Sequence, residues 1–447
     1  MFNEILEKLH SGFSIDVKYR IISLQSKKIG FIFLDFLTSS TLVNDIIFSI
    51  VSYPVTVVNA NNLLTHLMIN TVTKSRDINQ VMEAILKGEM GIFIEDDDEV
   101  IIVDTKKYPG RAIGEPDSEK VVRGSRDGFT ETLSTNIGLV RRRIASEDLI
   151  VEGYEIGKSS KTKVVLIYLK NRIHDLDLKD IRKRLETVNT LELTMSDKAL
   201  EEHITGNPYS PYPLVKYTER PDTFSSHLYQ GMFGILVDTS PSALLGPVSI
   251  FDHLQHAEEF RQTIIAGSYL RFIRFFGIII GFLSLPVWFL LLAMGKVSID
   301  MSFNKAFLQL ILIELTIEVL RMASIHTPSA LSTSMGLIAG LVVGNMAVEI
   351  GIVNQKIVFL GCISALSSYI TPSYELSIAN KMANIVLLAL IYFFKLPGFI
   401  IGMLSLIVYL ATLKSFRRHY LYPLLPFNLK AFFKQIFRKP YIKNEKS

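Results

Sequence analysis

The chain has 447 residues, of which 49% are hydrophobic and 20% are charged, and its mean hydropathy is +0.32. This balance excludes an ordinary soluble enzyme and favours a membrane protein of two or three domains. The net charge of +4 is too small to indicate nucleic-acid binding, and the single cysteine, Cys362, excludes a disulfide within the chain.

The first half of the chain alternates short apolar runs with helical stretches, and this pattern repeats. An apolar run followed by a helical stretch occurs at 28–34 and again at 163–169. A glycine-led strand that ends in an acid, followed by a turn and a second apolar run, occurs at 88–95 and at 231–238. We therefore predict two related α/β subdomains, although any α/β chain can produce such echoes by chance. No Gly-rich phosphate loop follows these strands, so nucleotide binding has little support.

A helical segment with three consecutive arginines connects the two halves. Its apolar residues recur every three to four positions from Phe129 to Ile144, which places them on one helical face. Arg141, Arg142 and Arg143 follow one another about 100° apart around the helix, so each needs a different partner. Many charged residues of both signs precede these arginines, between Arg111 and Glu131. Two interpretations remain open, a solvated surface of mutually paired charges or an ion-pair clamp that joins the subdomains or neighbouring protomers. The residues of this predicted clamp are Arg111, Glu115, Glu119, Arg123, Arg126, Glu131, Arg141, Arg142 and Arg143.

Two long motifs carry a resemblance to a known family. They are RAIGEPDSEKVVRGSRDGFTETLSTNIGLVRRRI at 111–144 and PSALLGPVSIFDHLQHAEEFRQTIIAGSYLRFIRFFGIII at 241–280. Both resemble the spore germination receptor A-subunit family, most closely its stage V sporulation protein AF branch, and the similarity spans about residues 20–415. Gly124-Ser125-Arg126 departs from the family's usual Gly-Pro-Arg turn.

The resemblance implies an architecture and a set of partners. It implies a two-part N-terminal domain on the core side of the spore inner membrane, followed by a membrane domain that assembles into an oligomeric ion channel. It implies a transporter-like B subunit and a lipoprotein C subunit as partners in the receptors. For the AF branch it implies other membrane components of dipicolinate release.

The first membrane segment is predicted at 275–294, which carries no charge and is long enough to cross the ~30 Å hydrocarbon core. Arg261, Arg271 and Arg274 precede it, so its N-terminal end should be inside. Pro286 lies in mid-span, and we expect it to kink the helix.

The next apolar segment, 306–320, contains two acids. Each charge at mid-bilayer costs about 2.5 kcal/mol or more, so a lipid-facing position is excluded for Glu314 and Glu318. Together with Arg321 they are spaced i, i+4 and i+7, which aligns them along one stripe. Two interpretations remain open, acids that line a pore or a partly inserted amphipathic segment with its acids paired to Arg321.

A third span is predicted at 329–353. Four small residues at intervals of four form a groove for close helix packing, within one subunit or between protomers: Ser332, Gly336, Gly340 and Gly344. Asn345 and Glu349 lie next to the groove, and a Glu deep in a span is a functional candidate. The predicted pore-lining residues are Glu314, Glu318, Asn345 and Glu349.

The remaining segments are short. Residues 357–370 are polar for a span, and the helical stretches 383–394 and 399–413 are separated by a break at Lys395 to Gly398. Helix breaks at membrane depth persist only where protein or a water-filled cavity satisfies the backbone, which favours a conduit. Six segments fit, although four full spans with re-entrant pieces remains open: about 275–295, 305–321, 329–353, 357–371, 382–395 and 398–413.

Both chain ends are expected on the cytoplasmic or core side. Glu4 and Glu7 interrupt the start and no long apolar core follows, so no signal peptide is expected. Residues 414–447 carry nine Lys or Arg against the single Glu445, which places the tail inside. Apolar residues at helical spacing between Leu429 and Phe437, flanked by lysines, predict a basic amphipathic helix on an anionic leaflet.

The predicted organisation combines an α/β N-terminal domain of two related subdomains with a polytopic all-α transmembrane domain. The predicted domains are a first α/β subdomain (1–105), a connecting helical segment with the Arg cluster (106–149), a second α/β subdomain (150–255), a transmembrane helical domain of four to six segments (256–413) and a basic amphipathic tail (414–447).

Enzymatic chemistry has little support in the sequence. His253 and His256 lie near Glu258 and Glu259, but their spacing is a weak metal signal, and a juxtamembrane helix is the better interpretation. We expect no enzyme, no cofactor and no metal. The preferred hypothesis is a homo-oligomeric, channel-forming germination subunit. The alternatives are a non-conducting scaffold for other germination proteins and a secondary transporter, which the broken helices suggest.

Overall fold

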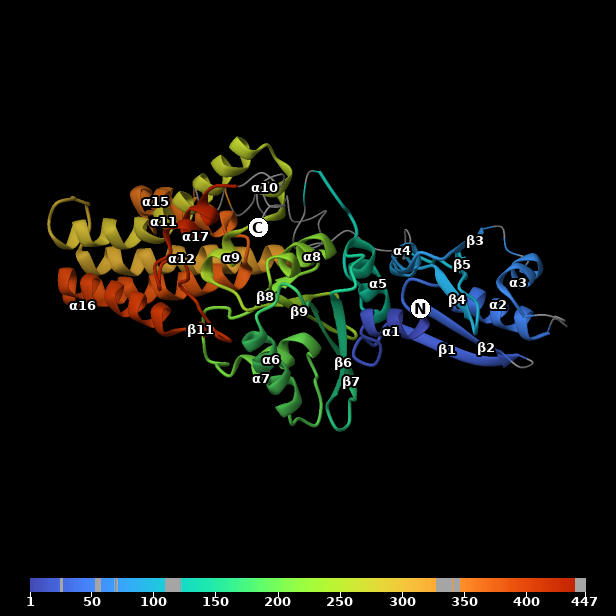
Figure 1. Ribbon diagram of the computed structural model, residues 1–447. Coiled ribbons are helices and arrows are strands. Elements are labelled where there is room, and N and C mark those ends of the chain that lie inside the picture. Colours follow the sequence, from blue (N-terminus) through green and yellow to red (C-terminus); the bar gives the residue numbers. More distant parts are fainter. Residues whose placement is uncertain are drawn as a thin grey trace. The chain divides into compact units, whose positions relative to one another are not determined.

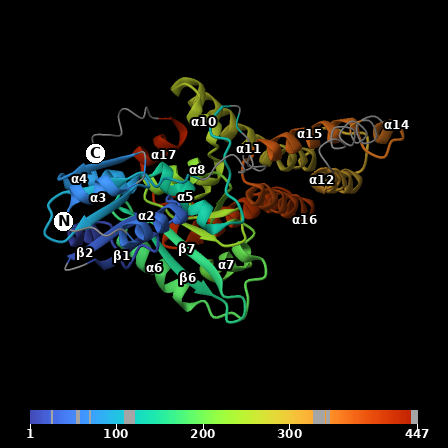
Figure 2. The same cartoon turned by 90° about the vertical axis from the view of Figure 1, so that its right-hand side faces the viewer.

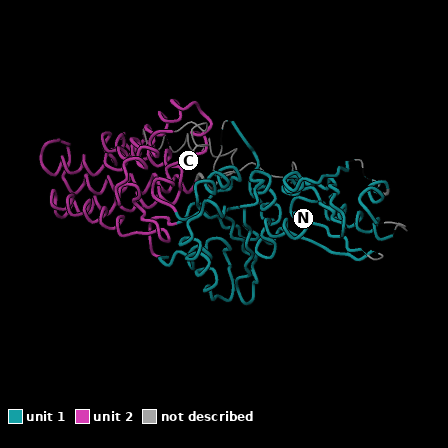
Figure 3. The backbone as a smooth tube through the Cα atoms, viewed as in Figure 1, with its two compact units in different colours: residues 1–208, 215–247 teal, residues 209–214, 248–447 magenta. Residues whose placement is uncertain are grey.

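The computed structural model describes residues 1–24, 27–52, 58–67, 69, 71–108, 121, 123–326, 340 and 346–438. The chain forms two compact units (Figure 3). The first comprises residues 1–208 and 215–247, and the second comprises residues 209–214 and 248–447. The division at residue 247 lies a few residues before the boundary that we expected near 255.

The first half of the first unit is a five-stranded antiparallel sheet with helices (Figure 1). Its strand order is β1-β2-β4-β5-β3. The central strands are apolar throughout because both faces of the sheet pack against helices, one in the Phe31 cluster and the other in the Ile32 cluster. The elements are α1 (Phe2–Lys8), β1 (Val17–Leu24), β2 (Lys27–Leu34), α2 (Ser40–Ser52), α3 (Ala60–His66), β3 (Val72–Ser75), α4 (Ile78–Leu86), β4 (Met90–Ile94) and β5 (Val100–Val103).

The second half of this unit repeats the same topology. Its strand order, β6-β7-β9-β10-β8, matches that of the first half position by position, so the predicted internal duplication is confirmed. The helix α5 takes the place of α1, and it is therefore the first element of the second repeat as well as a connector. The elements are α5 (Leu133–Arg143), β6 (Leu149–Ile156), β7 (Thr162–Leu169), α6 (Asp175–Thr187), α7 (Ser196–Thr205), β8 (Lys216–Thr218), α8 (Pro221–Tyr229), β9 (Phe233–Val237) and β10 (Ala243–Gly246).

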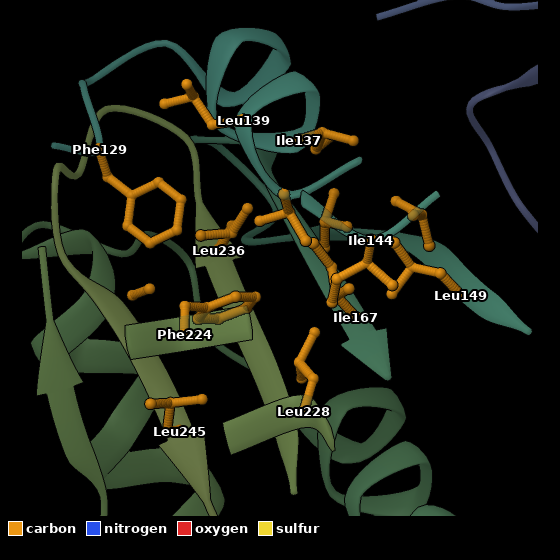
Figure 4. Packing of buried hydrophobic residues seen from close by; sticks show 14 of the residues in the cluster. Phe129, Ile137, Leu139, Ile144, Leu149, Ile167, Phe224, Leu228, Leu236 and Leu245 are labelled. Atoms are coloured by element: carbon orange, nitrogen blue, oxygen red, sulfur yellow. The ribbon is translucent and has the colours of Figure 1, made fainter. Parts of the chain in front are cut away.

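The predicted apolar face of the connecting helix is buried. Phe129, Ile137 and Ile144 pack with Phe224 of α8 in one cluster against the second sheet (Figure 4). Phe129 and Phe224 meet edge to face, with ring centroids 5.4 Å apart. This packing fixes α5, and with it the three arginines of its last turn.

The glycine that begins each repeated hairpin has a physical reason. Gly88 and Gly231 have φ values of 92° and 86°, a region that other residues rarely adopt. A Cβ on Gly88 would lie 2.9 Å from the carbonyl oxygen of Leu37, and one on Gly231 would lie 2.7 Å from that of Arg172. Leu37 and Arg172 each follow the second strand of their repeat, so the same close approach occurs twice.

The second unit is helical. Among the described residues, two helices, α11 and α16, are long and apolar enough to cross a membrane. The elements are α9 (Ile250–Leu254), α10 (Ala257–Arg261), α11 (Ile264–Ala293), α12 (Phe303–His326), α14 (Ala347–Glu349), α15 (Gln355–Ile370), α16 (Tyr374–Thr412), β11 (Lys414–Ser415), β12 (Arg418–His419) and α17 (Leu429–Ile436).

The helix α16 is a helical hairpin. Lys395 has φ 52° and ψ −127°, which confirms the predicted break between two helical stretches. A Cβ on Gly402 would lie 2.6 Å from a methyl carbon of Leu387, although 15 positions separate the two residues along the chain. The half after Lys395 therefore returns along the half before it.

The bundle of α11, α12, α15 and α16 has two distinguishable ends (Figures 1 and 2). At one end, here called the base, the chain enters and leaves: the Ser415 hydroxyl accepts a hydrogen bond from the Val248 amide at 2.9 Å. At the other end, here called the tip, the Lys395 turn lies beyond stacked aromatic rings. Phe307 and Tyr392 stack there with centroids 4.4 Å apart.

Candidate functional site: a polar cluster in the helical unit

Six polar side chains from α12 and α16 meet inside the helical unit. They are Glu314, Glu318 and Arg321 of α12 and Ser377, Lys381 and Asn384 of α16, and we call them the polar cluster. The two helices run antiparallel here, since Phe307 meets Tyr392 near the tip while Arg321 meets Ser377 near the base. The i, i+4 and i+7 spacing of the α12 residues therefore faces a matching polar stripe on α16.

Glu318 is the centre of the ion pairs. Its Oε2 lies 2.9 Å from Lys381 Nζ, and its Oε1 lies 3.3 Å from Arg321 Nε. Arg321 has two further contacts: its NH1 donates to the Ser377 hydroxyl at 2.8 Å, and its guanidinium lies over the Tyr374 ring, 4.4 Å from the centroid. Buried charges of both signs are thus brought together in an otherwise apolar bundle.

Glu314 lies one helical turn from Glu318, towards the tip. It is 2% exposed, and neither carboxylate oxygen has a regular hydrogen-bond partner among the described residues. Its polar neighbours are Ser364, Lys381 and Glu318. A buried carboxylate without a partner is costly, and such groups in native proteins usually have a functional reason.

A small polar cavity lies beside the cluster, between α11, α15 and α16. Its volume is about 20 Å³, enough for one water molecule. Lys381 and Asn384 line it together with hydroxyl side chains of α15 and of Thr371, the residue that follows α15. Two of these hydroxyls donate to backbone carbonyls, Ser367 to Ile278 and Thr371 to Ser367, so their lone pairs remain available as acceptors.

Asn384 has a defined structural partner. Pro286 has no N–H, so the carbonyl of Phe282 four residues earlier loses its helical donor. Asn384 Nδ2 donates to this carbonyl oxygen at 3.1 Å. The side-chain oxygen of Asn384, which is 3% exposed, has no hydrogen-bond partner among the described residues. The proline of α11 is therefore joined to the polar cluster.

The remaining membrane predictions are placed as follows. Glu349 is exposed, in the short α14. The chain just after it binds α12 near the tip: Gln309 donates to the Ile352 carbonyl at 2.8 Å. Gln309 is nine residues from Glu318, about 13 Å along the helix, so Glu349 is not part of the polar cluster. Gly340 is described, but Ser332, Gly336, Gly344 and Asn345 lie outside the described residues.

The three consecutive arginines of the first unit reach three different partners. Arg141, 2% exposed, forms a bidentate ion pair with Asp16, at 2.5 Å from Nε to Oδ2 and 3.2 Å from NH2 to Oδ1. Arg142 lies over the Tyr108 ring, 5.0 Å from its centroid. Arg143 binds Asp127 at 2.6 Å. Asp16 precedes β1, so the Arg141 pair joins the first repeat to the second within one chain.

The ion pair with Arg143 affects the pKa of the Asp127 carboxyl group. Burial alone would raise the pKa of this carboxyl group, but hydrogen bonds from Arg143 and Ser125 outweigh it and hold the pKa below its ordinary value. Arg123, Arg126 and Glu131 are exposed and have no ion-pair partner in the described part of the chain. Arg111, Glu115 and Glu119 lie outside the described residues.

Lys381, Asn384 and Asp16 belong to these clusters but were not predicted from the sequence. Lys381 and Asn384 precede the apolar run of α16, and their i, i+3 spacing was a signal of one polar face. Asp16 is a single acid before a strand, which carries no signal. Of the two histidines, His253 is buried, and His256 caps α10 by accepting a hydrogen bond from the Glu258 amide at 3.2 Å.

Comparison with known proteins shows which family has this sequence. Residues 3–447 match the family model described as Bacillus/Clostridium GerA spore germination protein. The chain is 39% identical to Stage V sporulation protein AF of Bacillus subtilis (strain 168) over 441 residues, covering 96% of this chain and 89% of that protein. It is 32% identical to Spore germination protein A1 of the same organism over 378 residues, covering 82% and 78%.

A solved structure is also similar. It is the crystal structure of the N-terminal domain of the A subunit of the Bacillus megaterium spore germinant receptor GerK3, with a TM-score of 0.42 and 23% identity, covering 55% of this chain and 92% of that one. The family match over nearly the whole chain confirms the resemblance found in the two motifs. The chain therefore belongs to the Bacillus/Clostridium GerA family of spore germination proteins, and it is a membrane protein and not an enzyme.

Proposed function

We propose that this protein is a membrane subunit of a spore germination complex, and that it forms, or contributes to, an oligomeric ion channel acting in ion or dipicolinate release. The observation that carries the proposal is the polar cluster. Glu314, Glu318, Arg321 and Lys381 are charged residues in the interior of the helical bundle, and each would cost about 2.5 kcal/mol or more in contact with lipid. Such residues in membrane segments commonly mark ion pathways.

The position of the polar cluster supports this role. From Glu314 to Arg321 it extends over eight residues of α12, about 10 Å, from the middle of the helix towards the base. On the tip side, Phe289, Phe303 and Tyr392 stack in its place. The bundle therefore has a polar half and an aromatic half, and we propose that the polar half belongs to the ion path.

The same proposal includes location and partners. We place the chain in the spore inner membrane with both ends on the core side, supported by the meeting of the two ends of the helical unit at the base. The proposed partners are further copies of the chain, a transporter-like B subunit, a lipoprotein C subunit or components of the dipicolinate channel. The exposed Leu429 and Phe433 of α17, with Lys430 and Lys434 beside them, support contact with anionic lipid.

A non-conducting scaffold is the second candidate, and one observation favours it. Glu318 is paired with both cations, so most of the charge in the cluster is already compensated inside one chain, as in a static structural joint. The main observation that suggested a secondary transporter no longer favours that function. The helix break at Lys395, which suggested it, is the turn of a helical hairpin.

Flux measurements separate these functions. The purified full-length protein is reconstituted in anionic liposomes, and K⁺ and dipicolinate efflux are recorded beside a mass measurement of the complex in detergent. We expect an oligomer with measurable efflux, and a changed rate for Glu318→Gln. Glu375→Gln is the matched control, because Glu375 is exposed at the start of α16. A tight bilayer in every assembly state would refute the channel, and unchanged ion release in Glu318→Gln spores would favour the scaffold.

A further inference from the structure

The charges of the polar cluster are balanced in number but paired unevenly. Two acids face two bases, yet Glu318 holds both Lys381 and Arg321 while Glu314 holds neither. Glu314 is the more deeply buried of the two acids, at 2% against 23% for Glu318. The more buried acid is therefore the one without a counter-ion, the reverse of what a purely static joint would need.

We propose that Lys381 is an exchangeable counter-ion that moves between Glu318 and Glu314, and that this exchange switches the helical unit between two charge-paired states. In the observed state Lys381 binds Glu318. In the second state it binds Glu314, one helical turn nearer the tip. The pairing itself needs only the contacts of this unit, whereas its consequence for ion flux rests on the proposed channel function.

The distance of the exchange suits a lysine. Residues i and i+4 on a helix have Cβ atoms about 5–6 Å apart, and the flexible four-carbon stem of lysine can cover this by changing rotamer. The second position of the Lys381 ammonium group, beside Glu314, also offers a hydrogen-bond acceptor. Because α12 and α16 run antiparallel and Lys381 is level with Glu318, the level of Glu314 is that of Asn384. The side-chain oxygen of Asn384 has no hydrogen-bond partner among the described residues, and it can accept from the ammonium group.

The cavity provides the room for this movement. Its lining includes both Lys381 and Asn384, and its volume of about 20 Å³ is close to that of one water molecule. An ammonium group is of similar size. Ser364, a polar neighbour of Glu314, also lines the cavity, so the cavity lies beside the Asn384 amide oxygen and next to the surroundings of the unpaired carboxylate.

Arg321 keeps its place in both states. It is held by Glu318, by the Ser377 hydroxyl at 2.8 Å and by the Tyr374 ring, and its planar guanidinium has little freedom to leave three partners at once. When Lys381 moves, Glu318 therefore retains a counter-ion. Neither state leaves Glu318 unpaired, which is the condition for two arrangements of similar free energy.

Double-mutant cycles on thermal stability test the exchange without any flux measurement. The full-length protein is purified in detergent, and the melting temperature is measured for Lys381→Met, Glu314→Gln and both together. We expect only weak coupling between them in the wild-type background, because Lys381 is a neighbour of Glu314 but is bound to Glu318. In a Glu318→Gln background the same cycle should show a stabilising coupling of several degrees. Lys356→Met, on exposed α15 surface, is the control and should not couple to Glu314 in either background.

Two outcomes would overturn the proposal: no coupling in either background, or equal coupling in both. If Glu318→Gln does not fold, Glu318→Asp weakens the first site and should produce the same coupling in part. In the liposome assay Glu318→Gln and Glu314→Gln should change ion efflux in opposite directions, and changes in the same direction would exclude gating by this exchange. Coupling in a protein that conducts nothing would support the exchange and refute only the channel.

Discussion

Replacing Arg141 by methionine should separate the two repeats of the first unit locally. The guanidinium donates five hydrogen bonds, two to the Asp16 carboxylate, one to the Ser14 hydroxyl and two to the carbonyls of Ser146 and Leu149. Methionine fills much of the same volume but donates none. Among the described residues, the carboxylate of Asp16, 1% exposed, would keep only the hydrogen bond from Ser14 at 2.7 Å.

The expected cost follows from this geometry. Removing one partner of a buried ion pair typically costs about 3–5 kcal/mol, because the other charge stays buried and uncompensated. Since about 1.4 kcal/mol corresponds to a factor of ten, local opening should become about 100-fold to several thousand-fold more frequent. Adding Asp16→Asn to Arg141→Met removes the orphaned charge and should recover part of the loss.

Hydrogen–deuterium exchange of the full-length protein measures this opening where it occurs. The Ile15 amide donates to the Val151 carbonyl at 2.9 Å, and the Val151 amide donates to the Ser14 hydroxyl at 3.1 Å. Peptides that contain these amides should lose protection in Arg141→Met. Arg142→Ala is the matched control, because the loss of an exposed cation–π contact costs about 0.5–1 kcal/mol, a change of roughly fivefold or less. Equal exchange in the two variants would refute the assignment of Arg141 as the joint between the repeats.

Two further predictions concern one residue in each unit. Burial would raise the pKa of Glu152, but hydrogen bonds from Arg182 and Tyr168 hold it below its ordinary value. The stability it provides is therefore present above about pH 4.3 and lost as the pH falls through the folded pKa, and Glu152→Gln should flatten this acid loss of the melting temperature. Asn384→Leu leaves the Phe282 carbonyl without a donor and should cost about 1–3 kcal/mol. Pro286→Ala restores a helical N–H, so the double variant should be less destabilised than the sum of the two, and strictly additive melting shifts would contradict this account.

The duplication could be predicted from sequence because it rests on local signals. The apolar runs at 28–34 and 163–169 became β2 and β7, and the glycine-led hairpins at 88–95 and 231–238 became β4–β5 and β9–β10. These patterns reflect periodicity and backbone conformation, which each segment carries by itself. The break at Lys395 was predictable for the same reason, since Pro397 and Gly398 disturb any helix locally.

The partners of charged residues could not be predicted, because they depend on contacts far apart in the chain. The spacing of Arg141, Arg142 and Arg143 required three partners but did not identify Asp16, which lies 125 positions away. Likewise the stripe of acids on α12 showed that Glu318 needs a counter-ion. That the counter-ion includes Lys381 depends on how the hairpin of α16 packs against α12.

The two buried charge clusters differ in how completely they are satisfied, and this difference indicates different roles. Arg141 uses all three guanidinium nitrogens, and Asp16 binds it through both oxygens, so any movement breaks several hydrogen bonds at once. Such a network rigidifies the structure around it. In the helical unit Glu314 and the Asn384 amide oxygen remain unsatisfied beside a cation that can reach them. Moving Lys381 there makes a new ion pair as the old one breaks, so the barrier between the states is set by the rearrangement and not by a lost charge pair. The Arg141–Asp16 network of the first unit thus holds one conformation, whereas the polar cluster of the helical unit can adopt two charge-paired states.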